Sequence, residues 1–195
     1  MDALILVDIQ NDFCPGGSLA VKDGDRVVPV ANELQKEFGL VVATKDWHPP
    51  GHASFETLWP PHCVQGTAGA EFAPALDTRR VAHVFLKGTD PAVDSYSGFF
   101  DNEHKRSTGL GDYLRAQGVT DVFICGLATD YCVKFTALDA LRLGFGTTVV
   151  EDGCRGVEVN AGDSARAVEE MRAAGARIVG SGDLLRARRA GSSAA

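Results

Sequence analysis

Six short runs of apolar residues recur along the chain and are separated by longer segments of mixed polarity. Several runs, such as ALILV and DVFIC, are apolar at every position, which is typical of strands buried on both faces of a parallel sheet. The pattern predicts strands at residues 3–8, 40–46, 81–87, 121–126, 147–151 and 177–179.

Four of the intervening segments have helical character and are each followed by a glycine, a residue that suits the left-handed position after a helix. We expect helices at 25–38, 109–117, 131–143 and 160–174, followed by Gly39, Gly118, Gly144 and Gly175. In the last helix Asn160 can act as the cap, and Asp163 adds negative charge to the first turn. This alternation predicts a three-layer α/β/α sandwich with a central, mostly parallel sheet of about six strands.

Two segments interrupt the alternation. Residues 48–76 are rich in Pro, Gly and His, and residues 88–108 form a shorter excursion. Because long loops inside compact domains are usually functional, we expect chemistry in the first of them. We expect a single domain over residues 1–185. The tail at 186–195 (RARRAGSSAA) is expected to be a fraying helix end followed by disorder.

Composition narrows the class of protein. The formal net charge of −7 argues against nucleic acid or an anionic membrane as a partner. We read no signal peptide and no membrane span, so we expect a cytoplasmic protein. The cysteine count is odd and the spacings are irregular, so we expect reduced thiols at Cys14, Cys63, Cys125, Cys132 and Cys154.

Polar and reactive side chains stand where four of the predicted strands end: Asp8, Asp46, Lys87 and, just after the fourth strand, Cys132. Ligands in parallel sheets bind at this edge. A helix N-terminus and a nearby lysine could stabilise a Cys132 thiolate, or Asp8 could accept the thiol proton as a base. The alternative is that Cys132 is a small buried hydrophobic residue.

A second group combines a carboxylate with three imidazoles: Asp46, His48, His52 and His62. Three such ligands with open positions are typical of a catalytic metal site, and mixed oxygen and nitrogen donors suit zinc, iron or manganese. The alternative is that the histidines face solvent. A third group is aromatic, and a flat substrate ring could stack on it: Phe13, Trp59, Tyr96, Phe99 and Tyr131.

Together these motifs resemble the isochorismatase-like cysteine hydrolases, and within them the nicotinamidases, also called pyrazinamidases. The resemblance spans about residues 2–185. It rests on LILVDIQNDFCPGGSLAV, TKDWHPPGHASF, WPPHCVQGTAGAEF, FLKGTDPAVDSYSGFFDN and GLATDYCVKFTALDAL. It implies a metal-assisted cysteine amidohydrolase that converts nicotinamide, and pyrazinamide, to the acid and ammonia through a thioester, in NAD salvage. A homo-oligomer is compatible with it.

The resemblance also implies a role for each matching residue. The catalytic triad would be Asp8, Lys87 and Cys132. The ligands of one divalent metal, zinc first and iron or manganese as alternatives, would be Asp46, His48 and His62 within a loop at about 46–76; members of the family differ in whether the residue at His52 binds. A cis peptide between Leu127 and Ala128 would turn the N–H groups of Ala128 and Cys132 into an oxyanion hole. The ring pocket would contain Phe13, Trp59, Tyr96 and Tyr131.

Three other readings compete with this one. An isochorismatase or a carbamoyl amidase would keep an acid and a lysine but lack the DWH and PPHC motifs that this chain carries. A flavodoxin-like binding module would explain the alternation of strands and helices, but not the cysteine, lysine and metal set. A thiol redox protein would need a C-x-x-C pair, which the sequence lacks.

Overall fold

The computed structural model describes residues 1–192. Its centre is a six-stranded sheet in the order β3-β2-β1-β4-β5-β6, in which every neighbouring pair is parallel. The strands are β1 (Asp2–Val7), β2 (Val41–Asp46), β3 (Val81–Lys87), β4 (Asp121–Leu127), β5 (Gly146–Arg155) and β6 (Arg177–Val179). The predicted strands are confirmed within one or two residues, except that β5 runs four residues further, to Arg155.

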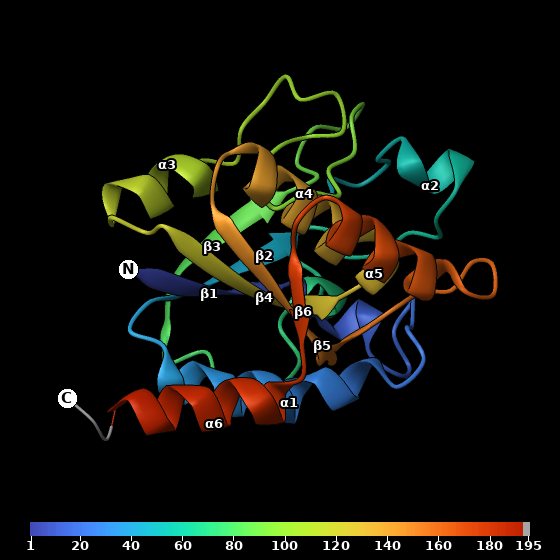
Figure 1. The fold of residues 1–195 in the computed structure, drawn as a ribbon. Coiled ribbons are helices and arrows are strands. Elements are labelled where there is room, and N and C mark those ends of the chain that lie inside the picture. The colour runs from blue at the N-terminus through green and yellow to red at the C-terminus, as the bar shows by residue number, and fades with distance from the viewer. Residues whose placement is uncertain (193–195) are drawn as a thin grey trace.

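Helices cover both faces of the sheet (Figure 1), as the sequence predicts. They are α1 (Val27–Leu34), α2 (Ser54–Thr57), α3 (Leu110–Ala116), α4 (Lys134–Arg142), α5 (Asp163–Ala173) and α6 (Ser181–Ser192). Helices α1 and α6 lie side by side on one face, and α3, α4 and α5 lie on the other (Figure 1). The central strands can be buried on both faces because they are apolar at every position. Residues 3–7 of β1, for example, are completely inaccessible to solvent.

Three details differ from the sequence prediction. Helix α1 ends at Leu34 and continues only as a 3-10 turn, Gln35–Glu37, so Gly39 is not in the left-handed region, whereas Gly118, Gly144 and Gly175 are. Helix α5 begins at Asp163 and its cap is Gly162. Asn160 is therefore not the cap residue. Its backbone N–H donates to the Asp163 carboxylate at 2.7 Å, so Asp163 supplies the accepting side chain at this end of the helix.

The C-terminal segment is also more ordered than predicted. Residues 186–192 continue α6, and the expectation of disorder for 193–195 lies outside the described residues. The helix is held by Arg188, whose guanidinium lies 3.9 Å from the ring centroid of Phe38 and donates to Asp2 Oδ2 at 2.6 Å. The sequence analysis could not anticipate this contact, because Asp2 and Phe38 are distant from Arg188 in the chain. Within residues 1–192, no helix is both long and apolar enough to cross a bilayer.

Candidate functional site

The four polar residues predicted at strand ends do come together. Asp46 and Lys87 are the last residues of β2 and β3 and are paired in register. Asp8 follows β1, and Cys132 lies in a π-helical turn, Thr129–Val133, that follows β4. These strands are neighbours in the sheet and run parallel, so their carboxyl ends meet at one edge.

Lys87 is the centre of this group. Its Nζ lies 2.8 Å from Asp8 Oδ2 and 2.6 Å from Asp46 Oδ1, and it donates to the Ser95 carbonyl at 2.8 Å and to Cys132 Sγ at 3.3 Å. The side chain is fully buried. Burial alone lowers the pKa of an ammonium, but the carboxylates of Asp46 and Asp8 outweigh it and raise the Lys87 pKa well above its ordinary value. Lys87 is therefore a buried, permanently charged ammonium.

The carboxyl of Asp8 has a raised pKa. Burial raises its pKa above the ordinary value, while Lys87 lowers it in part. Thr44 Oγ1 donates to Asp8 Oδ1 at 2.6 Å, which fixes one oxygen. The backbone of Asp8 is left-handed, with φ of 48°, a conformation that persists in a non-glycine residue where surrounding contacts hold it. Oxygen and sulfur atoms of Asp8, Asp46 and Cys132 all lie within 4.8 Å of one another.

Cys132 rests as a thiol. Burial raises its pKa well above the ordinary value, and the opposing effect of Lys87 does not cancel it. A thiol in this state needs a base to accept its proton before it can act as a nucleophile. Both groups that the sequence offers for activation lie beside the sulfur, with Lys87 Nζ 3.3 Å from Cys132 Sγ and an Asp8 oxygen within 4.8 Å of it. The peptide between Leu127 and Ala128, just before the turn that carries Cys132, is cis.

The metal candidates form a compact group. Donor atoms of Asp46, His48 and His62 lie within 4.8 Å of one another, and all three residues are buried. The Nδ1 atoms of His48 and His62 face the carbonyls of Gly88 and Pro60 at 3.0 and 2.8 Å. A carbonyl only accepts, so both Nδ1 atoms carry a proton, and in the neutral form of each ring the free lone pair is on Nε2. These Nε2 atoms lie 3.6 and 3.7 Å from Asp46 Oδ2.

The residues fit a metal ion by their chemistry. His48 Nε2 is buried and has no hydrogen-bond partner among the described residues, which is costly for a polar atom unless a ligand satisfies it. Carbonyls that accept from one ring nitrogen of an imidazole, and so orient the other nitrogen, are typical of metal sites. One carboxylate and two imidazoles leave open positions, as in catalytic rather than structural sites.

His52 lies beside this group but not in it. Its ring centroid is 4.3 Å from that of His48, and its donor atoms group with those of His48 and Asp94. Its Nδ1 is bonded to Ser54 Oγ at 2.8 Å, and its buried Nε2 has no partner among the described residues. Sequence reasoning missed Asp94, although it lies in the 88–108 excursion and within the motif FLKGTDPAVDSYSGFFDN.

The aromatic residues close a pocket over Cys132. Phe13, Trp59, Tyr96 and Tyr131 line a cavity of about 20 Å³, room for about one water, together with Asp46, His62, Asp94 and Cys132. Trp59 Nε1 donates to Tyr96 Oη at 3.3 Å, and both rings pack on Tyr131. Phe99, the fifth aromatic residue of the group, is not in this lining: it is fully buried and stacks on Phe145.

The other cysteines have no part in this site. All five cysteines are free and buried, in agreement with the expected reduced thiols. Cys63 follows a candidate ligand, but among the described residues it belongs to none of the groups of donor atoms that could hold a metal ion. Burial raises the pKa of Cys154 to about 12. Cys132 alone lies against the lysine and the pocket.

Comparison with known proteins agrees with this geometry. Residues 2–183 match the isochorismatase domain family. A nicotinamidase of Escherichia coli (strain K12) is 49% identical over 198 residues, covering 90% of this chain and 93% of the relative. A nicotinamidase and pyrazinamidase structure from Acinetobacter baumannii has a TM-score of 0.91 at 42% identity, covering 94% of this chain and 97% of that one.

A third relative bears on the metal group. The structure of a pyrazinamidase of Pyrococcus horikoshii in complex with zinc has a TM-score of 0.83 at 45% identity, covering 92% of this chain and 98% of that one. Family match, sequence identity and fold point the same way. The chain belongs to the isochorismatase domain family and, within it, to the nicotinamidases.

Proposed function

We propose that this protein is a nicotinamidase, an amidohydrolase that converts nicotinamide to nicotinic acid and ammonia and also accepts pyrazinamide. The observation that carries the proposal is the single buried cluster in which Lys87 contacts Asp8, Asp46 and Cys132, beneath an aromatic pocket. The names of relatives that are 45–49% identical support the substrate. We also propose that the reaction takes place in the cytoplasm and belongs to NAD salvage, the role that the sequence resemblance implies.

The first half of the reaction makes a thioester. Asp8 accepts the Cys132 proton as Sγ attacks the carboxamide carbon, and the carbonyl oxygen takes the negative charge. Lys87 stays protonated throughout and stabilises the ionised Asp8 and the developing charge. When the C–N bond breaks, the nitrogen takes the proton from Asp8 and leaves as ammonia.

The second half releases the acid. Asp8, again ionised, accepts a proton from water as the water oxygen attacks the thioester carbon. The C–S bond breaks, and the sulfur recovers the proton from Asp8. The backbone N–H groups of Ala128 and Cys132 are the proposed oxyanion donors, and one such donor typically contributes about 10²- to 10³-fold in rate.

Asp46, His48 and His62 are the proposed ligands of one divalent metal, with zinc first and iron or manganese as alternatives. The bound metal would anchor and polarise the substrate ring through its nitrogen. The zinc complex of the Pyrococcus horikoshii relative supports the choice of metal. His52, next to His48, is a candidate additional ligand. Phe13, Trp59, Tyr96 and Tyr131 are the proposed ring-binding residues.

The test is release of ammonia and nicotinic acid from nicotinamide by purified protein of known metal content. We expect turnover that is lost on chelation and restored by zinc, iron or manganese. A folded, metal-loaded sample that releases neither product would contradict the proposal. Activity on a carbamoyl amide instead would indicate another amidase of the same family.

A further inference from the structure

The segment that follows Asp8, residues 10–12, contacts both pieces of chain that carry the metal candidates. We propose that Gln10 and Asp12 are positioning residues for the metal: Gln10 sets Asp46, and Asp12 sets His62 and His48. This inference rests on the proposed function, because it takes Asp46, His48 and His62 as the ligands.

Gln10 holds the backbone of Asp46 from both sides. Its Nε2 donates to the Asp46 carbonyl at 2.8 Å, and its Oε1 accepts the Asp46 N–H at 2.8 Å. The same Nε2 donates to the Ala70 carbonyl at 2.9 Å, in the second half of the metal loop. Gln10 is completely buried, so water cannot replace these bonds. One side chain thus fixes where β2 ends and which way Asp46 points.

Asp12 holds the histidines through Cys63. Its Oδ2 accepts the Cys63 N–H at 2.7 Å, directly after His62, and Cys63 adopts a left-handed backbone with φ of 45°. The carbonyl of Cys63 in turn accepts the N–H of His48 at 3.0 Å. Asp12 thus positions the backbone of Cys63, which is bonded covalently to His62 and accepts a hydrogen bond from the backbone of His48.

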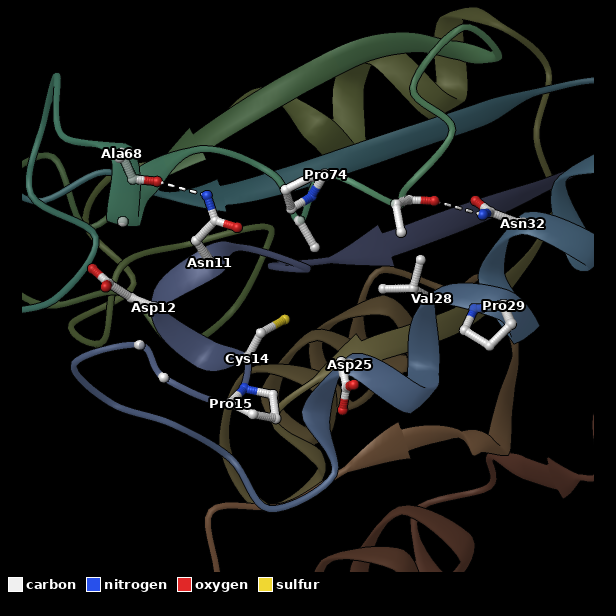
Figure 2. Close-up of a pocket in the computed structure, with 15 residues that line it drawn as sticks. Asn11, Asp12, Cys14, Pro15, Asp25, Val28, Pro29, Asn32, Ala68 and Pro74 are labelled. Atoms are coloured by element: carbon white, nitrogen blue, oxygen red, sulfur yellow. Dashed lines mark hydrogen bonds between the residues drawn. The ribbon is translucent and has the colours of Figure 1, made fainter.

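The contact between the two segments leaves little freedom. Gly69 packs so closely that a Cβ there would lie 2.1 Å from Asp12 Oδ2. Asn11 Nδ2 donates to the Ala68 carbonyl at 2.8 Å, and Figure 2 shows this bond, with Asp12 beside it, at the rim of an open surface groove. None of the proposed triad, metal or ring-binding residues lines this groove. The contacts at its rim matter because they attach residues 68–69 of the loop to the segment that follows β1.

Position matters because the two oxygens of Asp46 face different partners. Oδ1 is 2.6 Å from Lys87 Nζ, and Oδ2 faces the Nε2 atoms of both histidines. A rotation of the carboxylate that suited one partner would lose the other. Gln10 holds the backbone from which this carboxylate extends, which explains a buried amide that takes no part in the chemistry itself.

The test is zinc affinity, measured on apo-protein by competition with a chelating dye. Gln10→Met keeps the length of the side chain and removes its three hydrogen bonds. We expect it to weaken zinc binding roughly 10- to 100-fold, the usual effect of losing an outer-shell partner. The matched control is Gln35→Met, a second fully buried glutamine that lies beyond α1 and contacts no site residue. The visible spectrum of bound cobalt should shift in Gln10→Met and not in the control.

A purely structural role for Gln10 would lower the Tm of the apo-protein while leaving the affinity of the folded fraction and the cobalt spectrum unchanged, and that result would overturn the inference. If Gln10→Met does not fold, Gly69→Ala displaces the Asp12 carboxylate from the other segment, and it should weaken zinc binding similarly; unchanged affinity there would also overturn the inference. Wild-type protein that binds no zinc, iron or manganese would refute the metal site itself, and this inference with it.

Discussion

Asp46 and Lys87, the last residues of adjacent strands, form an ion pair with Nζ 2.6 Å from Oδ1, while the other oxygen of Asp46 faces His48 and His62. Burial raises the pKa of Asp46, but Lys87 and His48 outweigh it and hold that pKa well below its ordinary value. The carboxylate therefore stays ionised and belongs to both halves of the site. The metal group and the triad are not independent modules.

Replacing the proposed nucleophile should abolish turnover without affecting metal binding. We expect Cys132→Ala to lose measurable nicotinamide turnover while keeping its metal content, because the sulfur is not one of the proposed ligands. The measurements are ammonia release and metal analysis of the same sample. Cys125→Ala, which removes a fully buried thiol inside β4, serves as the control and should stay active despite lower stability. Wild-type turnover by Cys132→Ala would end the assignment.

Activity should fall in acid at a pH set by Asp8. Burial raises the Asp8 pKa above its ordinary value of 3.8, and only the ionised form can accept the thiol proton. We therefore expect the acid limb of kcat/KM, measured at constant metal occupancy, to lie above pH 3.8. An enzyme fully active down to that pH would contradict the role of Asp8 as base.

The carboxyls of Asp8 and Asp46 have opposite effects on how the free energy of unfolding changes with pH. The raised pKa of Asp8 means that its contribution to folding is present below the unfolded pKa and is lost as pH rises through the folded pKa. The lowered pKa of Asp46 means that its contribution is present above the unfolded pKa and is lost as pH falls through the folded pKa.

Gly88 leaves the space that the His48 ring occupies. A Cβ on Gly88 would lie 2.4 Å from His48 Cε1, and φ there is 63°. We expect Gly88→Ala to displace the imidazole and weaken metal binding by about tenfold or more, measured by chelator competition. Gly66→Ala is the matched control, since Gly66 has a similar φ of 75° and open space around it. Equal affinities for the two variants would show that the ring position does not matter.

The pocket aromatics should act mainly on substrate binding. Phe13→Leu keeps an apolar side chain but removes the ring, and we expect KM for nicotinamide to rise by roughly fivefold, about 1 kcal/mol, with a smaller change in kcat. Phe99→Leu is the comparison, because Phe99 stacks on Phe145 away from the pocket. A KM that rises for Phe99→Leu but not for Phe13→Leu would refute the assignment of the pocket.

Arg188 should contribute to stability and not to catalysis. Its guanidinium stacks on Phe38 and donates to Asp2 and to the Glu37 carbonyl. We expect Arg188→Ala to lower the free energy of unfolding by about 1–2 kcal/mol, a fall in Tm of roughly 2–8 °C, with kcat/KM unchanged. Arg186→Ala removes an exposed arginine that pairs within the same helix and should change Tm little. Equal losses would show that the docking contact of α6 is not the cause.

The sequence by itself determined the fold class and most of the site. Runs apolar at every position indicate strands buried on both faces, and parallel strands end at one edge of the sheet. Asp8, Asp46, Lys87 and Cys132 could therefore be placed together by position alone. Their residue types, and the histidines of the long loop, indicated the chemistry because few other functions need that combination.

Only the tertiary structure decided how these groups act on one another. Whether Cys132 rests as thiol or thiolate depends on the balance of burial and charge, which no spacing along the chain records. Several features depend on contacts between segments far apart in sequence. They are the hydrogen bonds of Gln10 and Asp12 to the segments that carry the metal candidates, the position of Asp94, the place of Phe99 outside the pocket, and the docking of Arg188. Periodicity reports which face of an element is buried, but the partner that covers it is set by how the chain crosses over the sheet.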